Sequence, residues 1–281
     1  MPARVCPYCR ELNGASEPRC HRCGRRLPGP LLEGTSRLAR EVLGADAPIT
    51  RLVLGLELLV FALLVAADRR FPIGFNDAFR GSTLLRLGAL GGPLTAGEPY
   101  RLLSAVFVHM GVLHVGMNMW MFSDLGARLE RELSGSRAAL IFLVSGVLGF
   151  VVSGFWYSYT LGFSPLTAGA SGGVFGQIGA EVGILRARRD PEWRRSLMRN
   201  VLYALLLSFA LRGVNTAAHL GGFAAGIALG FLFEVERRRY RLELVWRALT
   251  GLTLVLVVVS VLLSTHSTAW QARRVQELVY E

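Results

Sequence analysis

The sequence predicts an all-α polytopic membrane protein preceded by a small zinc-ribbon-like module. Of its 281 residues, 52% are hydrophobic, and they form long apolar blocks instead of the periodic scatter of a soluble fold. The basic residues are all arginine, and they lie in short clusters between those blocks, as in the cytoplasmic loops of membrane proteins. All four cysteines fall within the first 30 residues, which are otherwise polar.

Residues 1–30 are predicted to form a cytosolic zinc-ribbon-like module. Cys6 with Cys9, and Cys20 with Cys23, make two C-x-x-C pairs that ten residues separate. In a reducing cytosol four thiolates at this spacing favour one structural Zn²⁺, with a redox switch as the alternative. The arginines around these pairs are interpreted as a solvated charged face, although nucleic acid or anionic lipid could bind them. We expect no targeting sequence, because no apolar segment follows a charged start.

Beyond this module the apolar blocks indicate seven helical spans. Residues 31–49 are interpreted as a polar linker, residues 50–235 as a six-span core, and residues 236–281 as a cytoplasmic loop, a seventh transmembrane helix and a short outer tail. A span needs about 20 apolar residues. Residues 68–100 are too interrupted by Gly and Pro to span, yet too apolar for a solvated loop. The predicted spans cover roughly residues 50–67, 102–127, 138–158, 169–185, 199–212, 216–234 and 246–264.

The arginines also predict the orientation of the spans. The loops after the second, fourth and sixth spans carry most of them, so these loops are expected in the cytoplasm. The loop after the third span, residues 159–168, has no charged residue and is expected outside. The amino terminus then lies in the cytoplasm and the carboxyl terminus outside the plasma membrane. Arg69, Arg70, Arg80 and Arg86 run against this rule, which we attribute to a structured, partly embedded outer segment. Arginines dispersed in this way argue against nucleic-acid binding by the core.

Four polar side chains inside the predicted spans share one depth. Ser171, His219, His114 and Asn118 all fall near the outer ends of their spans. Burying a polar side chain in a bilayer costs free energy, so each of them is a candidate functional residue. His114 and Asn118 are four residues apart and therefore lie on one helix face. Alone, a serine in a glycine-rich span usually packs or bonds to the backbone. Together these groups offer a nucleophile, a base and two donors for an oxyanion.

Small residues recur at every fourth position in two of the spans, and such faces let helices approach closely. If the two faces meet, Ser171 and His219 come within hydrogen-bonding reach. The glycines around Ser171 also leave its hydroxyl accessible. The small residues are Gly172, Gly176 and Ala180 in one span and Ala218, Gly222, Gly226 and Gly230 in the other.

No acidic residue is expected at this depth. Glu57, Asp124 and Glu181 fall toward the cytoplasmic half of the predicted spans, so we expect a Ser-His dyad without a third, acidic member. Glu57 is expected to pair with an arginine near the inner surface.

The order of the motifs along residues 50–235 resembles that of the rhomboid family of intramembrane serine proteases. The motifs are Tyr100-Arg101, Phe107-Val108-His109, His114-Val115-Gly116-Met117-Asn118, Gly126-Ala127-Arg128-Leu129-Glu130, Gly169-Ala170-Ser171-Gly172 and Ala218-His219-Leu220-Gly221-Gly222. The resemblance implies a serine endopeptidase that cleaves transmembrane segments of membrane proteins near the outer face of the bilayer, with no cofactor for catalysis. A seventh span after the core is similar to the common bacterial and secretory-pathway arrangement.

The same resemblance implies a role for individual side chains. Ser171 would be the nucleophile and His219 its base, while His114 and Asn118, with the backbone N–H of Ser171, would hold the oxyanion. Phe175 stands where the family places an aromatic ring against the histidine. The other implied supporting residues are Gly169, Gly172, Gly222 and Arg101, the last in the first outer loop, where Tyr100 replaces the usual tryptophan.

Two other classes of protein remain as alternatives. A catalytically dead relative would bind membrane proteins without cutting them, and the intact Ser171 and His219 argue against it. A channel or transporter would more often carry charged residues along an intramembrane pathway.

Overall fold

The computed structural model describes residues 4–6, 11–14, 16–24, 26–27, 46–68, 72–73, 77–210, 214–237 and 242–280. These residues form two compact units, Met1–Pro48 and Ile49–Glu281, which are treated separately below. In the first unit, strands β1 (Arg4–Val5) and β2 (Leu12–Asn13) pair antiparallel, with Arg4 opposite Asn13. The predictions for Cys9 and for residues 31–45 of the linker lie outside the described residues.

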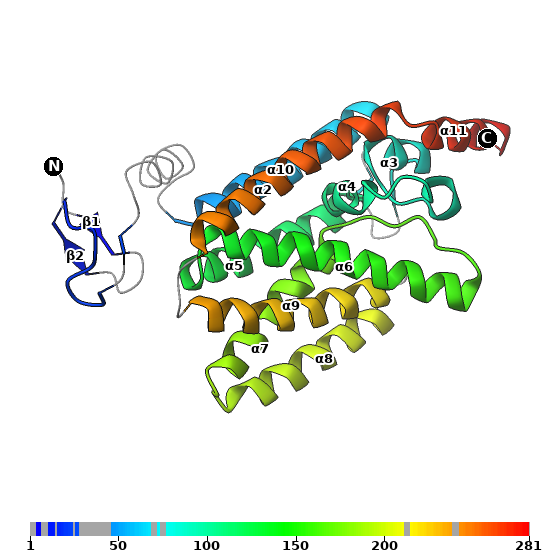
Figure 1. The fold of residues 1–281 in the computed structure, drawn as a ribbon. Coiled ribbons are helices and arrows are strands. Elements are labelled where there is room, and N and C mark those ends of the chain that lie inside the picture. The colour runs from blue at the N-terminus through cyan, green and yellow to red at the C-terminus, as the bar shows by residue number, and fades with distance from the viewer. Residues whose placement is uncertain are drawn as a thin grey trace. The chain divides into compact units, whose positions relative to one another are not determined.

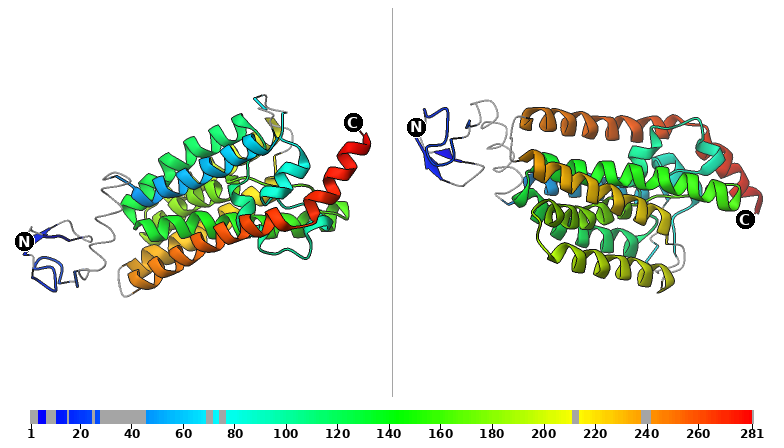
Figure 2. Two further views of the ribbon diagram at one scale, coloured as in Figure 1. Left: turned by 90° about the horizontal axis from the view of Figure 1, so that it is seen from above. Right: turned by 60° about the horizontal axis from the view of Figure 1, so that its bottom comes forward.

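The second unit is a bundle of long helices, and this confirms the predicted all-α membrane class (Figures 1 and 2). In it, α7 packs against α6, α8 and α9, while α10 packs against α3, α4 and α6. The described helices are α2 (Pro48–Asp68), α3 (Gly81–Leu87), the 3₁₀ helix η1 (Gly92–Thr95), α4 (Arg101–Phe107), α5 (Val112–Glu132), α6 (Gly135–Leu161), α7 (Ser171–Ala187), α8 (Glu192–Ala210), α9 (Thr216–Arg237), α10 (Glu243–His266) and α11 (Ala269–Tyr280).

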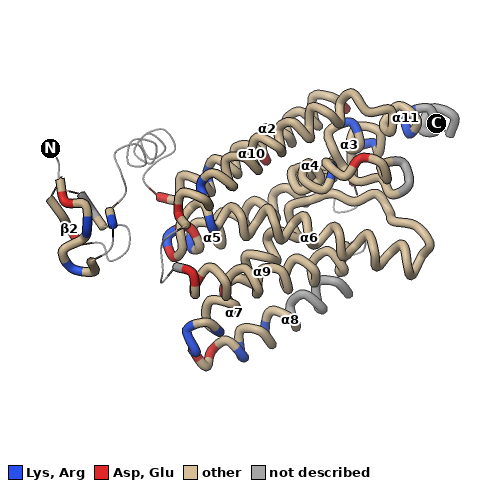
Figure 3. The backbone as a smooth tube through the Cα atoms, viewed as in Figure 1, with Lys and Arg blue, Asp and Glu red and all other residues tan. Residues whose placement is uncertain are grey.

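By length and composition, α2, α6, α9 and α10 are long and apolar enough to cross a membrane, and α4 with α5 would make a fifth, bent span. The remaining two predicted spans correspond to α7, which has only 17 residues, and α8, whose first half carries several charges. Figure 3 shows that charged residues gather toward the ends of the helices and are nearly absent from their middle. This distribution suits a bilayer around the bundle.

The second predicted span, residues 102–127, is wrong as a single helix. The chain instead breaks between α4 and α5, which meet at an angle of 94°. At the break, Val112 donates its N–H to the carbonyl of Pro72 at 2.9 Å, and Met110 accepts the N–H of Phe79 at 2.9 Å. The broken turn therefore exchanges helical hydrogen bonds for bonds to a distant segment.

The segment before α4 is structured around the fully buried side chain of Arg101. Its guanidinium donates to the carbonyls of Leu85 (2.5 Å) and Ala89 (3.1 Å) and pairs with the carboxylate of Glu98. Glu98 also accepts from the hydroxyl of Ser267 at 2.6 Å, beyond the end of α10. Burial raises the pKa of Glu98, but the hydrogen bonds from Ser267 and Arg101 outweigh it and hold that pKa below its usual value. This network fastens the segment before α4 to the residue that follows α10.

Arg137, near the start of α6, occupies a similar position at the opposite end of the bundle. Its side chain is fully buried and donates to Glu236 at 2.7 Å and to Ser134 at 3.0 Å, and it also pairs with Glu243. The charge of Arg137, which the sequence predicts to lie in a loop, therefore links α6 to α9 and to the start of α10 inside the bundle. Buried charges are tolerated when they are paired in this way.

The two small-residue faces meet between α7 and α9. A Cβ atom on Gly222 would collide with the carbonyl oxygen of Gly172, and one on Gly226 with that of Gly176. Further along, Gly230 lies against the backbone of Ala180. The two helices touch backbone to backbone over most of their length, so their relative position is fixed by packing that admits no side chain.

Candidate active site

Ser171 and His219 lie on the two helices that the glycines hold together. Ser171 is the first residue of α7, and His219 is in the first turn of α9. The Nε2 atom of His219 is 2.9 Å from the Oγ atom of Ser171, which is a normal hydrogen-bond distance. His219 is buried, with 5% of its surface exposed, whereas Ser171 is half-buried. The contact between Gly172 and Gly222 lies beside this pair and sets its spacing.

The ring of Phe175 stacks on the imidazole of His219. Its ring lies 4.3 Å from that of His219, with 18° between the planes. Within the described part of the chain, the Nδ1 atom of His219 has no hydrogen-bond partner, so no carboxylate faces it. The imidazole is therefore oriented by ring packing and by its bond to Ser171.

Asn215 is a positioning residue that the sequence analysis missed. Its Oδ1 atom accepts the N–H of Ala218 at 3.0 Å, and its Nδ2 atom donates to Ser153 on α6 at 2.7 Å. Its backbone carbonyl accepts the N–H of His219 at 3.1 Å. An asparagine directly before a helix is a common N-cap, and this signal, just before Thr216, could have identified it.

His114 lies against the segment that leads to Ser171. A Cβ atom on Gly169 would be 2.7 Å from Cε1 of His114, and the φ angle of Gly169 is +130°, so only glycine fits there. The Nδ1 atom of His114 accepts the N–H of Met110 at 3.4 Å. A neutral histidine that accepts at Nδ1 carries its proton on Nε2, where it can donate to a substrate.

Asn118 is buried one turn after His114, with 7% of its surface exposed. Its Nδ2 atom donates to the carbonyl of His114 at 2.8 Å, which leaves its second N–H for another acceptor. No hydrogen bond joins it to Ser171 among the residues described. The expected site residues Ser171, His219, Phe175 and Gly172 are thus close together by direct contact. His114 adjoins this group through Gly169, and Asn118 adjoins it through His114.

The expected pairing of Glu57 with an arginine is wrong. Glu57 and His109 are both fully buried, and Oε2 of the acid lies 3.7 Å from Nδ1 of the histidine. The ring of His109 in turn meets that of His114 edge-on, with centroids 5.1 Å apart. The bend between α4 and α5 explains the error, because it carries His109 into the bundle to face α2.

The cysteines of the first unit are gathered as a metal site requires. The Sγ atoms of Cys6, Cys20 and Cys23 all lie within 4.8 Å of one another, and Cys6 and Cys20 are buried. Gly24, with a φ angle of +69°, donates its N–H to the carbonyl of Cys20 at 2.8 Å and closes a tight turn around the second pair. Three converging thiols suit tetrahedral Zn²⁺ with one further thiolate, and Cys9, the expected fourth, lies outside the described residues.

Comparison with known proteins agrees with these motifs. The family model for the Rhomboid domain matches residues 96–236. RHOMBOID-like protein 4 of Arabidopsis thaliana is 33% identical over 166 residues, which is 56% of this chain and 41% of that protein. Rhomboid protease GluP of Bacillus subtilis (strain 168) is 30% identical over 191 residues, which is 64% of this chain and 34% of that protein. Rhomboid-like protease 3 of Toxoplasma gondii is 28% identical over 158 residues, which is 55% of this chain and 59% of that protein.

The match spans from about one third to about three fifths of the length of these relatives. The family model for the Rhomboid domain covers half of this chain, and the matched residues include Arg101, His114, Asn118, Ser171 and His219. Together with the apolar helices, this makes the chain an integral membrane protein. The chain belongs to the rhomboid family.

Proposed function

We propose that the chain is an intramembrane serine endopeptidase that cleaves transmembrane segments of membrane proteins near the outer face of the bilayer. The observation that supports this most directly is the 2.9 Å contact between Ser171 and His219 at the ends of two tightly packed helices. The names of its relatives, which include rhomboid proteases, point the same way. No cofactor is needed for this chemistry.

In the proposed reaction Ser171 and His219 act as a dyad. The hydroxyl of Ser171 attacks a peptide carbonyl while Nε2 of neutral His219 accepts its proton. The imidazolium then gives that proton to the leaving amine, and a water molecule activated by His219 hydrolyses the acyl-enzyme. Since no carboxylate among the described residues faces Nδ1, the stacked ring of Phe175 keeps the base in place.

The oxyanion would be held by groups around the start of α7. The first N–H groups of a helix have no acceptor within it, and Ser171 is the first residue of α7. Nε2–H of His114 and the unused N–H of Asn118 complete the set. All three donors exist before the reaction begins, which is the arrangement that stabilises developing charge most.

The arginine distribution supports a multi-pass topology in the plasma membrane, with the amino terminus in the cytoplasm and the carboxyl terminus outside. Residues 1–30 would then be a cytosolic module, 31–49 a linker, 50–235 the protease core, and 236–281 a loop, a seventh span and an outer tail. The partners of the core would be transmembrane substrates and the lipid bilayer, with no nucleic acid.

Labelling by a serine-directed fluorophosphonate tests this function. The wild-type protein should be labelled and Ser171→Ala should not, because only a serine activated by a base reacts. Ser123→Ala removes a half-buried serine on α5 whose hydroxyl donates to the carbonyl of Trp120, and should leave labelling intact. A folded wild-type protein that resists labelling would instead fit a dead relative or a transporter.

We also propose that Cys6, Cys9, Cys20 and Cys23 hold one structural Zn²⁺ that takes no part in catalysis. Metal analysis of the purified full chain should give about one zinc per molecule, and Cys6→Ser should lose most of it. Ser171→Ala is the matched control and should keep its zinc. Wild-type protein that lacks zinc and carries disulfides instead would identify a redox module.

A further inference from the structure

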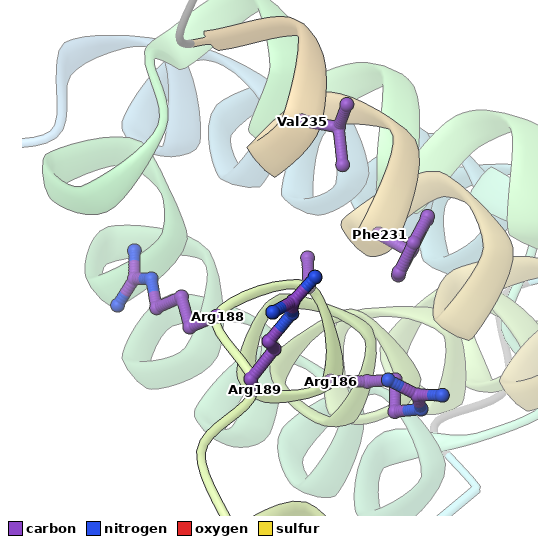
Figure 4. A pocket seen from close by; sticks show the side chains of 6 residues that line it. Arg186, Arg188, Arg189, Phe231 and Val235 are labelled. Carbon is purple, nitrogen blue, oxygen red and sulfur yellow. The ribbon is translucent and has the colours of Figure 1, made fainter.

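A pocket opens between the end of α7 and the last turns of α9, at the opposite end of α7 from Ser171 (Figure 4). Its volume is about 610 Å³. The residues that line it are Arg186, Ala187, Arg188, Arg189, Phe231 and Val235. With 17 residues in α7 and a rise of about 1.5 Å per residue, the pocket is roughly 25 Å from the proposed nucleophile. It therefore has no part in the proposed reaction.

The three arginines differ in what balances their charge. Arg188 pairs with Glu132 at 2.6 Å and with Glu234 at 3.0 Å, so its charge is met inside the protein. Arg186 lies over the ring of Trp193, 5.3 Å from its centre. In the described parts of the chain, neither Arg186 nor Arg189 has a carboxylate partner. The pocket thus presents two uncompensated positive charges.

Arg189 occupies a backbone position that usually belongs to glycine. Its φ angle is +60°, and Asp190 donates its N–H to the carbonyl of Leu185 at 3.0 Å, which closes the end of α7 in the manner of a Schellman turn. Figure 4 shows its side chain extending from this turn toward Phe231 and Val235. A charged side chain is therefore held at the pocket by a turn that glycine would form more easily.

The α9 side of the pocket is apolar and uncovered. Phe231 and Val235, one turn apart, are 42% and 41% exposed. They belong to a helix apolar enough to cross a membrane, near the end where the arginines lie. An anion held by the two arginines can also contact the exposed apolar surface of Phe231 and Val235 only if it carries hydrocarbon chains. A free phosphate ion offers none.

We propose that this pocket binds the phosphate headgroup of an anionic phospholipid, with an acyl chain lying along Phe231 and Val235. Basic pockets at the ends of membrane helices attract such headgroups, and each arginine contributes about five-fold to the affinity. The site depends only on α7 and α9 lying in a bilayer, and not on the proposed proteolysis.

The full-length protein in a neutral detergent provides the test. Binding of phosphatidylglycerol, phosphatidylcholine, glycerol phosphate and inorganic phosphate is measured by native mass spectrometry and by the rise in Tm. We expect phosphatidylglycerol to bind and the other three to bind at least ten-fold more weakly. Arg186→Gln and Arg189→Gly should each weaken phosphatidylglycerol binding about five-fold, and the double variant about 25-fold.

Two features make the variants decisive. Glycine suits the backbone at position 189, so Arg189→Gly keeps the fold while removing the charge. Arg131→Gln removes an exposed arginine in the last turn of α5 and should bind lipid normally. Equal binding of phosphatidylcholine, or unchanged binding by the double variant, would overturn the proposal. So would equal binding of inorganic phosphate, which would make the pocket a site for soluble anions.

Discussion

Ser171→Ala and His219→Ala should each abolish cleavage of a model transmembrane substrate. The hydroxyl cannot attack without the base, and the base has nothing to activate without the hydroxyl, so the two act as one unit. Loss of either should lower kcat by up to about 10⁶-fold, and the double variant should be no slower than either single one. Turnover is measured on a labelled substrate in proteoliposomes, with products identified by mass spectrometry.

The 2.9 Å contact makes this a sharp test, because both side chains are positioned by helices that the substitutions leave intact. Ser123→Ala is the control and should cleave normally. Tm values should stay close to that of the wild type, since neither change opens the contact between α7 and α9. Substantial cutting by folded Ser171→Ala protein, or losses that multiply in the double variant, would refute the dyad.

Asn118→Ala should lower turnover by about 10²–10³-fold, the usual effect of losing one oxyanion donor. KM should change less, because the donor acts on charge that exists only in the transition state. We expect this loss of turnover because Asn118 uses only one of its two side-chain N–H groups to bond the carbonyl of His114. The second N–H is left for the oxyanion. Steady-state kinetics on the same substrate separate kcat from KM.

A second variant guards against a purely structural effect. His114→Ala removes the other side-chain donor, and its loss should also appear mainly in kcat. If both variants turn over at the wild-type rate, the developing charge must be stabilised by other groups. A rise in KM alone would indicate that the two side chains bind substrate without favouring the transition state.

The fold class could be predicted because long apolar blocks have few interpretations. The break between α4 and α5 could not, since its cause is a pair of hydrogen bonds that join Met110 and Val112 to Phe79 and Pro72, some thirty to forty residues earlier. Residues 108–111 carry no proline, and the apolar pattern runs through them. Periodicity reports only local preference, whereas this break depends on a distant partner.

The candidate site could be predicted to a larger extent. Depth inferred from the arginines placed Ser171 and His219 together, and the small-residue faces of α7 and α9 do meet. The partners of the buried charges were harder to predict from the sequence, since Glu57 lies beside His109 and Arg137 pairs with two acids across the bundle. Both pairings depend on which distant helices pack together, which spacing along the sequence does not encode.

The buried pair of Glu57 and His109 has a consequence for how the protein is made. The helix α2 leaves the ribosome before His109, and an acidic side chain at the centre of a membrane helix costs about 2.5–3.5 kcal/mol on insertion. The mean hydropathy of 2.3 in the apolar window of α2 is high enough to offset this. His109 follows 52 residues later, which at about 5–20 residues per second is a delay of roughly 3–10 seconds. During this interval α2 carries Glu57 in the membrane without His109. The two side chains can pair only after the segment between α4 and α5 has been translated.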